Sequence, residues 1–425
     1  MPAILNAEGL WIVVIAATTN AACALVGSFL VLRRLSMMGD ALSHAVLPGL
    51  AAAFILSGSY SIGPLMLGAV AAGLVATLLI HTLHHYARVP GDASMGVVFT
   101  SLFALGVVLV EQGIHGVHFD VKCVYEGTLE LTPFWTWNVL GYDLPRAFVV
   151  TGGALSINAL LVALLWKELK LSAFDPALAT TMGFSAAAMH YLLMTLVAMT
   201  AVASFEAVGS ILVVAMLIIP PATAHLLADR LGAMVLLAVF IAALSAVLGY
   251  LAGAWLDTNL AGMITVAAAA LYGLAVLFSP RHGLVSAARR NWQIALRVVS
   301  EDLLAMLYRV EELGGQRRLG AAEAQSALGG GLLARWALAK LLRGGRVERA
   351  GDRLELTATG RESARQLVRS HRLWETYLVK HLGLPLDHVH QGAHRTEHYI
   401  GRQLRDQLQQ EVEANAADPH GREIP

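Results

Sequence analysis

Charged residues are scarce in this chain of 425 residues, and their scarcity excludes most soluble proteins. Asp, Glu, Lys and Arg supply only 14% of the residues, whereas 56% are hydrophobic. An average soluble domain carries about 25% charged residues. Cysteine is also rare, and the 2 that occur, Cys23 and Cys123, lie far apart in the chain. They imply no disulfide scaffold.

The few charges are unevenly distributed along the chain. Residues 1–280 carry 8 Lys and Arg and 13 Asp and Glu, whereas residues 281–425 carry 22 and 17. The net charge of zero is therefore the sum over two parts of the chain that differ in their content of charged residues. We interpret the first as a membrane body and the second as a soluble, mildly basic tail of about domain size.

Long apolar runs fill the first part. The run from Leu10 to Leu32 has neither a basic n-region nor a small-residue cleavage pattern, so we interpret it as a spanning helix rather than a signal peptide. At about 20 residues per crossing, further runs qualify. They are 42–57, 61–83, 93–112, 146–166, 189–205, 207–227, 231–255 and 260–279. The sequence thus predicts an all-α polytopic membrane bundle of about nine transmembrane helices.

Basic residues between these runs predict the orientation. Most of them fall on one side of the membrane if the N-terminus is outside, as the positive-inside rule requires. These residues are Arg33, Arg34, Arg88, Lys167, Lys170, Arg230, Arg281, Arg289 and Arg290. We expect a multi-pass protein of the inner (plasma) membrane, surrounded by lipid, with a cytoplasmic C-terminal tail.

Asp40 and His44 are the most informative ionisable residues within the apolar part. They lie four positions apart on a helical stretch and share one face, where a carboxylate beside an imidazole forms a divalent metal half-site. The alternative is that the two side chains only hydrogen-bond each other. Glu206, near a helix junction, either assists them in an ion path or lies in water at the outer interface.

Three separated motifs resemble those of one transporter family. The first comprises Arg33-Arg34, Gly39-Asp-Ala-Leu-Ser-His44 and Leu47-Pro-Gly49. The others are Phe174-Asp-Pro-Ala-Leu-Ala-Thr-Thr-Met-Gly183 and the helix Val208 to Ala224. Together they resemble the ABC-3 permeases, the membrane subunits of zinc, manganese and iron ABC importers. The resemblance covers about residues 10–280 and implies a permease domain over 1–285, in which Asp40 and His44 bind the transported ion.

No Gly-x-x-x-x-Gly-Lys-Ser/Thr pattern occurs in the chain, so ATP hydrolysis must reside on another polypeptide. Asp175 and Pro176 are typical of an N-cap and the first residue of a helix, and this pattern predicts a short cytoplasmic coupling helix. The alternative is that Asp175 only caps an ordinary loop. By the resemblance, ATPase coupling involves Asp175, Pro176, Ala179 and Gly183. The family also implies an extracytoplasmic solute-binding protein and a second permease, identical or different.

The tail alternates helical patterns with a turn-rich segment. An amphipathic stretch runs from Trp292 to Leu313, and Arg346–Ala350 with Arg353–Thr357 reads as a β-hairpin around Gly351-Asp352. This order predicts a winged-helix domain over 300–366. A helix from Arg361 to Leu382 and another from Pro385 to about Ala414 then form an α-helical domain over 367–425.

Potential metal ligands gather on these last two helices. His390, His394, Glu397 and His398 follow the spacing i, i+4, i+7, i+8, which places them on one stripe of a helix, and His371 with Glu375 forms an i, i+4 pair. A salt-bridged polar face or a pH-sensitive histidine cluster are the alternatives to metal binding.

The tail resembles the iron- and manganese-dependent repressors, the family of the diphtheria toxin repressor. The resemblance rests on His371-Arg-Leu-Trp-Glu375, Leu382-Gly-Leu-Pro385, Val389-His390, Glu397-His398 and Asp418-Pro-His-Gly-Arg-Glu-Ile-Pro425. It implies one metal site at His371, Glu375 and His390, and another at His394, Glu397 and His398, with Asp302 at a ligand position of the manganese-sensing branch. His394 stands where the family usually has Cys or an acid. The family also uses this region to dimerise.

The expected DNA-reading helix, Leu332 to Leu342, has almost none of the polar side chains that hydrogen-bond to base edges. The three glycines Gly329-Gly-Gly331 also make the turn before this helix poorly defined in the sequence. We therefore argue against sequence-specific DNA binding. The sequence predicts a transport subunit rather than an enzyme, namely a permease for manganese, iron or zinc ions with a cytoplasmic metal-sensing domain that regulates transport. The alternatives are a membrane-tethered, metal-dependent transcriptional regulator and a proton-coupled carrier.

Overall fold

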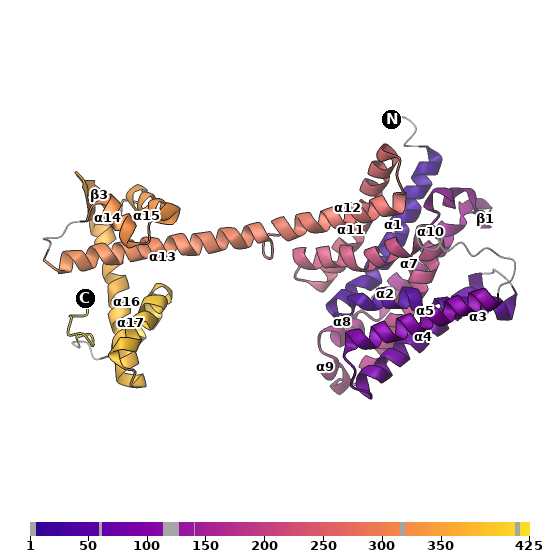
Figure 1. The fold of residues 1–425 in the computed structure, drawn as a ribbon, viewed down its shortest axis with the longest axis horizontal. Coiled ribbons are helices and arrows are strands. Elements are labelled where there is room, and N and C mark those ends of the chain that lie inside the picture. The colour runs from indigo at the N-terminus through magenta and orange to yellow at the C-terminus, as the bar shows by residue number, and fades with distance from the viewer. Residues whose placement is uncertain (1–5, 59–61, 114–126, 140, 315–318, 413–416) are drawn as a thin grey trace. The chain divides into compact units, whose positions relative to one another are not determined.

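The chain forms two compact units, Met1–Ser286 and Ala287–Pro425, in a computed structural model. The structure describes residues 6–58, 62–113, 127–139, 141–314, 319–412 and 417–425, and of Ser43, Ile62 and Glu206 it describes the backbone alone. Figure 1 gives the order of the elements in each unit.

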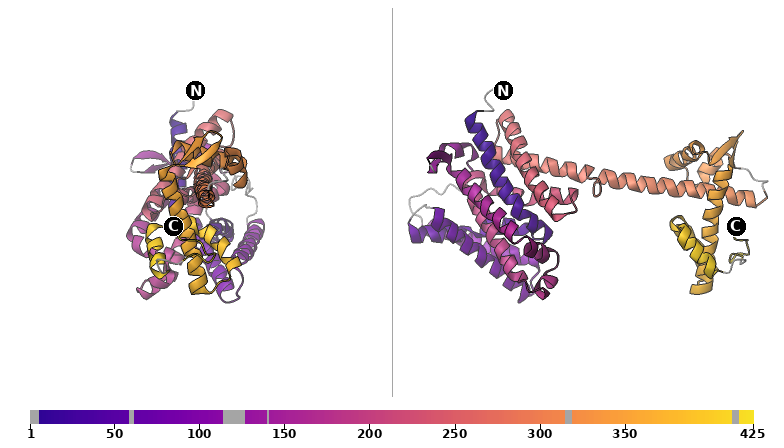
Figure 2. Two further views of the ribbon diagram at one scale, coloured as in Figure 1. Left: turned by 90° about the vertical axis from the view of Figure 1, so that its left-hand side faces the viewer. Right: turned by 180° about the vertical axis from the view of Figure 1, so that it is seen from behind.

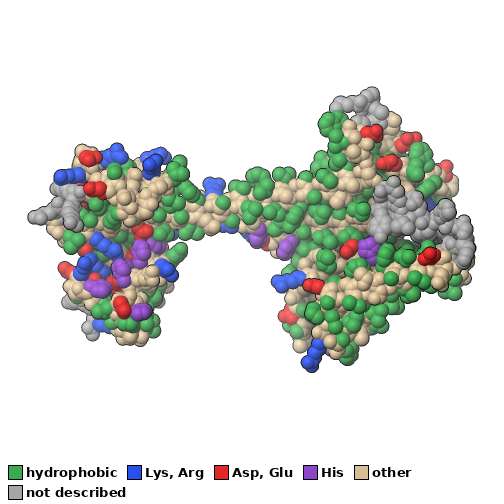
Figure 3. All heavy atoms as spheres, in the orientation of Figure 1, with side chains coloured by type: hydrophobic (Ala, Val, Ile, Leu, Met, Phe, Trp, Pro, Cys, Tyr) green, Lys and Arg blue, Asp and Glu red, His purple; other side chains and the backbone are tan. Residues whose placement is uncertain are grey.

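The first unit is a bundle of helices. Within the described ranges, 9 helices are long and apolar enough to cross a membrane, as the sequence predicts. They are α1 (Ala7–Leu32), α2 (Ser36–Ala45) continued by α3 (Leu47–Ser57), α4 (Ile62–His85), α5 (Gly91–Gly113), α7 (Arg146–Leu164), the two halves of α10 (Ala186–Leu227), α11 (Leu231–Leu256) and α12 (Leu260–Phe278). Hydrophobic side chains cover much of the face of this unit in Figure 3, as contact with lipid requires.

Helices α1 and α10 form the centre of this bundle and run side by side (Figures 1 and 2). Small residues make the close approach possible, since Ala22, Ala24 and Ser28 of α1 are fully buried. At Gly27 an added Cβ would collide with the backbone of Leu217 on α10. Glycine is therefore required where the two helices cross.

Two of the spanning segments are interrupted. The second span begins at Ser36 rather than at residue 42 and turns at Val46, between α2 and α3, with Pro48 in the first turn of α3. Helix α10 is broken at Gly209, whose φ of 76° and ψ of 166° are not helical. Both interruptions lie next to residues that the sequence places on the ion path.

A segment before α7 has structure that the sequence pattern does not reveal. It contains the 3-10 helix η1 (Leu129–Phe134) and a hairpin of β1 (Thr136–Val139) and β2 (Tyr142–Pro145). In the sequence, this segment falls in the long loop between the apolar runs 93–112 and 146–166. Four-residue strands, exposed at most positions, carry too little hydrophobic alternation to be recognised.

The second unit begins within α13 (Leu284–Glu312) and contains a winged helix, formed by α14 (Ala321–Ala327), α15 (Gly331–Arg343) and the hairpin of β3 (Val347–Ala350) and β4 (Arg353–Leu356). The hairpin register pairs Val347 with Leu356 and Ala350 with Arg353, as predicted. The triple glycine forms the turn between α14 and α15, because Gly329, Gly330 and Gly331 all have positive φ. The turn is thus well formed, contrary to the sequence prediction.

The remaining elements are α16 (Ala358–Leu382), α17 (Leu386–Thr396), the 3-10 turn η2 (Glu397–Tyr399) and α18 (Arg402–Glu411). The prediction of one helix from Pro385 to about Ala414 is wrong. The chain leaves the helix so that Ile400, which is 5% exposed, packs with Leu373, Leu408 and Val412, and Gly401 then takes up an extended conformation. The predicted ligand stripe therefore lies on a helix and the 3-10 turn that follows it.

Candidate metal sites

The candidate ion site of the membrane unit lies on the short helix α2, which packs against α5 and α10. His44 Nε2 is 3.5 Å from Asp40 Oδ1, and both side chains are only partly covered. The imidazole of His44 also contacts the rings of Phe99 and Phe103 on α5, with centroids 6.0 and 5.6 Å away. The pair thus shares one face, as the spacing predicts, with an aromatic wall on one side.

Glu206 lies in α10, three residues before the break at Gly209. Its side chain lies outside what the structure describes, so its predicted place on the ion path stays a prediction. The backbone places the residue where the two halves of α10 meet.

The predicted coupling segment forms a separate short helix, α9 (Pro176–Thr181), between α8 (Trp166–Phe174) and α10. Asp175 caps it, since its Oδ1 accepts a hydrogen bond from Leu178 N at 2.9 Å. Ala179 is fully buried, and Gly183 ends the segment with a φ of 88°. Asp175, Ala179 and Gly183 thus shape the helix, and the coupling role expected of them and of Pro176 stays a prediction.

Three apolar side chains beside this helix are exposed, and the sequence analysis missed them. Phe174 is 63% exposed, Leu178 46% and Met182 61%. Their spacing of four residues indicates that they share one face of a helix. The spacing does not show whether this apolar face is buried or exposed.

In the second unit, His371 and Glu375 of α16 meet His390 of α17. Glu375 Oε1 lies 3.1 Å from His371 Nε2 and 2.9 Å from His390 Nδ1. His371 and Glu375 are buried, whereas His390 is exposed. All three donor atoms lie within 4.8 Å of one another. We call this set the α16 group.

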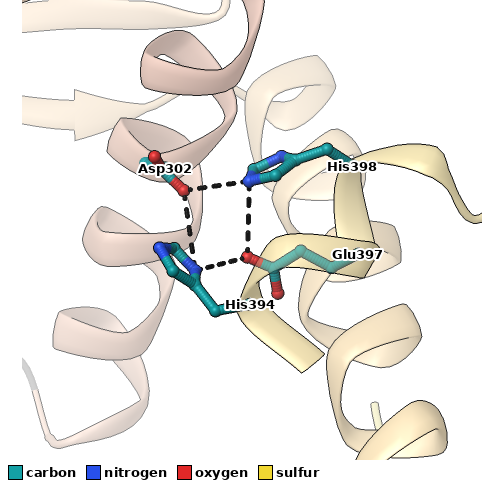
Figure 4. Close-up of side chains that lie close together, drawn as sticks. All are labelled: Asp302, His394, Glu397 and His398. Atoms are coloured by element: carbon teal, nitrogen blue, oxygen red, sulfur yellow. Dashed lines mark hydrogen bonds and ion pairs between the residues drawn. The ribbon is translucent and has the colours of Figure 1, made fainter. Parts of the chain in front are cut away.

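Asp302 of α13 meets His394 of α17 and Glu397 and His398 of η2 in a second set, which we call the η2 group (Figure 4). Asp302 Oδ1 is 3.3 Å from His398 Nε2 and 3.9 Å from His394 Nδ1, and Glu397 Oε1 is 3.0 Å from His394 Nδ1. The four side chains point toward one another from two segments that are far apart in the sequence (Figure 4).

The donor atoms of these groups are suited to a divalent transition metal. Asp302 Oδ1, His371 Nδ1, Glu397 Oε2 and His398 Nε2 are buried and pair with one another, Asp302 with His398 and His371 with Glu397. Burying such groups is costly unless they are paired or bind a metal ion. Imidazole nitrogens and carboxylate oxygens are the ligands that manganese, iron and zinc share. These residues would hold the ion, and the ion would supply the positive charge that satisfies them.

The carboxylates set the protonation of the histidines. Burial acts to lower the pKa of His398, but hydrogen bonds to Asp302 and Glu301 outweigh it and raise this pKa to about 9. Burial also acts to raise the pKa of Glu375, yet hydrogen bonds from His371 and His390 outweigh it and lower this pKa to about 2. Because its pKa is raised, His398 of the η2 group holds a proton that a metal ion would displace.

Glu301 is a further residue that the sequence analysis missed. Its Oε2 accepts a hydrogen bond from His398 Nδ1 at 2.8 Å, and its Oε1 accepts one from Arg297 Nε at 2.9 Å. The contact orients the imidazole so that Nε2 faces the other donors, as supporting carboxylates do in metal sites. Its i, i+4 spacing from Arg297 suggests only a surface ion pair.

Comparisons with known proteins divide the chain as the structure does. The model of the ABC 3 transport family matches residues 8–279. The model of the iron dependent repressor, metal binding and dimerisation domain matches residues 357–425.

Individual relatives are membrane proteins of metal transport systems. The manganese transport system membrane protein MntD of Bacillus subtilis is 41% identical over 66% of this chain and 95% of its own length. The zinc transport system membrane protein TroD of Treponema pallidum is 38% identical over 82% and 96%. Among solved structures, PsaBC from Streptococcus pneumoniae in complex with Fab matches with a TM-score of 0.56 and 30% identity, over 65% of this chain and 94% of that chain.

Proposed function

The chain belongs to the ABC 3 transport family and is the permease subunit of an importer of manganese, zinc or iron ions, and we propose that its C-terminal domain senses the imported metal. Nine candidate spanning helices among the described residues, and the Asp40–His44 pair on α2, support the transport role of the first unit. Two adjoining groups of metal donors, each partly buried, support sensing by the second.

In the proposed transport path, Asp40 and His44 hold the ion transiently within the bundle. A carboxylate and an imidazole supply two ligands, which leaves coordination positions for water or further groups. Two protein ligands hold an ion less firmly than a closed set of four, and release is as necessary as binding. Glu206 is proposed as an additional acid on this path.

The importer requires other chains. We propose that a separate ATPase binds the cytoplasmic side of the permease at α9, where exposed Phe174, Leu178 and Met182 form an apolar surface around a capped helix. An extracytoplasmic solute-binding protein would deliver the ion, and a second permease would complete the pore. With the N-terminus outside, the basic loops and the C-terminal domain lie in the cytoplasm.

Regulation follows if metal binding changes how the second unit interacts with the transport cycle. Metal ligation joins Asp302 of α13 to His394, Glu397 and His398, so occupancy of the η2 group ties α13 to the helices that follow α16. Helix α13 begins at Leu284, soon after the last spanning helix ends at Phe278. A bound ion must stabilise one transport state over another, since equal interaction shifts nothing.

Feedback inhibition is the testable consequence. Uptake of metal is measured in cells preloaded with increasing metal, for the wild type and for a variant with Glu397→Ala and His398→Ala. We expect wild-type uptake to fall as the cytoplasm fills, and the variant to continue. Identical inhibition curves would remove the regulatory role and leave the transport role untouched.

A membrane-tethered regulator that binds DNA is a second candidate, favoured by the winged helix that α14, α15 and the β3–β4 hairpin form. The outward face of α15 carries exposed Leu332, Arg335 and Trp336, which can contact phosphate and lipid but supply few hydrogen bonds to base edges. We propose that it does not read sequence. Selective binding of the purified full chain to one promoter duplex over a scrambled duplex would reverse this assignment.

A further inference from the structure

A pocket of about 510 Å³ opens in the second unit beside the η2 group. Its walls come from α13, from the C-terminal part of α15 and from the turn that leads to β3. The lining residues are Arg297, Ser300, Glu301, Leu304, Lys340, Leu341, Gly344 and Arg346. None of the metal donors described above lines the pocket, so it is a separate site that shares one wall with them.

Positive charge dominates this pocket. Three cations, Arg297, Lys340 and Arg346, face one carboxylate, Glu301. Glu301 is already engaged by Arg297 and by His398. Within the described residues, Lys340 and Arg346 form no side-chain hydrogen bond or ion pair. Like charges brought together without counter-charge repel each other, and an anion would relieve that repulsion.

The other groups that line the pocket limit which anion can bind. Ser300 already donates its hydroxyl proton to Leu296 O, and the backbone N–H groups of Gly344 and Arg346 bond to Lys340 O and Leu341 O. Recognition therefore falls to the three cations, which suit phosphate. Leu304 and Leu341 add an apolar wall, and the volume is that of a small-molecule site rather than of a bare ion.

We propose that this pocket binds a phosphate group carried by a small molecule or a lipid headgroup, and that its occupancy strengthens metal binding at the η2 group. The link is Arg297, which donates to Glu301 Oε1 and, through Nη2, to the backbone carbonyl of His398 at 3.3 Å. Phosphate on Arg297 places negative charge beside the metal donors. By reciprocity, metal then strengthens phosphate binding.

The first experiment measures binding of inorganic phosphate to the full chain in detergent after metal removal by a chelator, using calorimetry. Because no metal is present, the result tests phosphate binding independently of the proposed metal sensing. We expect one phosphate per chain, and binding about tenfold weaker or more for the double variant Lys340→Ala, Arg346→Ala. The matched control is Arg343→Ala, an exposed cation of the same helix that does not line the pocket.

Retained binding in Arg343→Ala with loss in the double variant supports the site, provided both melt like the wild type. Undetectable phosphate binding by the wild type, or equal binding by the double variant, overturns it. Binding of duplex DNA without any binding of phosphate also overturns it, because the cations would then form a surface rather than a pocket.

Two further arms identify the phosphate source and the coupling. In nanodiscs, weaker phosphate binding with phosphatidylglycerol than with phosphatidylcholine identifies an anionic lipid headgroup, whereas equal binding identifies a soluble phosphate compound. For the coupling, Mn(II) affinity is measured with free metal held by a buffer, with and without phosphate. Phosphate should increase the affinity of the wild type but not of the double variant. An unchanged wild-type affinity would contradict the coupling.

Discussion

Glu397 Oε2 lies 2.5 Å from His371 Nδ1, so one carboxylate connects the two groups of metal donors in the second unit. Its other oxygen faces His394 of the η2 group, while the Nε2 of His371 faces Glu375 of the α16 group. A charge shared in this way makes the two groups interdependent. Filling one group fixes the carboxylate and the imidazole that the other requires.

The first prediction is that Glu397→Gln weakens metal binding strongly at both groups, whereas Glu375→Gln weakens it mainly at the α16 group. Loss of a ligand should exceed the roughly 10- to 100-fold cost of losing a supporting residue. Calorimetric titration of the metal-free full chain with Mn(II) measures both steps. Glu411→Gln, an exposed acid of α18, is the matched control. Two unaffected binding steps in Glu397→Gln would contradict the shared role.

The second prediction tests whether Glu301 orients a metal ligand rather than binding the metal itself. Glu301→Gln removes the negative charge that orients His398 but leaves all four donors of the η2 group, so the number of ions bound should stay the same. Affinity should fall by about 10- to 100-fold. The pKa of His398, followed by NMR, should fall toward 6.5 from about 9. An unchanged pKa would show that Glu301 does not act through this imidazole.

The third prediction concerns pH. The pKa of His398 is raised from 6.5 to about 9, so its proton stabilises the metal-free domain fully below pH 6.5, and this contribution disappears as pH rises through 9. The metal must displace the same proton, so metal affinity should rise over that range. Thermal unfolding without metal and Mn(II) titration at several pH values should therefore show opposite slopes. A variant His398→Asn should lose the first slope.

The sequence predicts the two units and most helices because their signals are local. Apolar runs longer than a membrane crossing identify the spans, and Gly351-Asp352 between short strands identifies the hairpin. The position at which α17 ends is not determined by a local sequence signal. Nothing near Glu397 in the sequence shows that Ile400 must be buried against Leu373 of α16, and that tertiary contact ends the helix.

The candidate sites divide in the same way. Spacing alone pairs Asp40 with His44 and His371 with Glu375, because residues four apart share a helix face. That Asp302 on α13 meets His398 on η2 follows from packing between distant segments, and only the family resemblance anticipates it. The role of Glu301 is visible only when the orientation of the His398 ring is known.

The fourth prediction concerns the transported ion. Asp40→Asn and His44→Gln preserve size but remove a charged or a metal-binding atom, so each should reduce uptake to the background of a transporter-free strain. The protein should still insert and bind its ATPase. Asp257→Asn is the matched control, because it also neutralises an acid and asparagine tolerates the left-handed φ of 52° at this position. Wild-type uptake by Asp40→Asn would remove this residue from the ion path.

The fifth prediction concerns the ATPase surface on α9. Leu178→Asp or Met182→Asp places a charge where an apolar partner surface would have to desolvate it, so the ATPase should no longer co-purify with the permease. Leu178→Met keeps the surface apolar and should leave the complex intact. Asp175→Ala removes only the cap, which costs about 1 kcal/mol, so it should weaken the complex without abolishing it. Co-purification in detergent, with the ATPase rate of each complex, measures the outcome. An ATPase that binds Leu178→Asp and Met182→Asp as tightly as the wild type would place the coupling surface elsewhere on the permease.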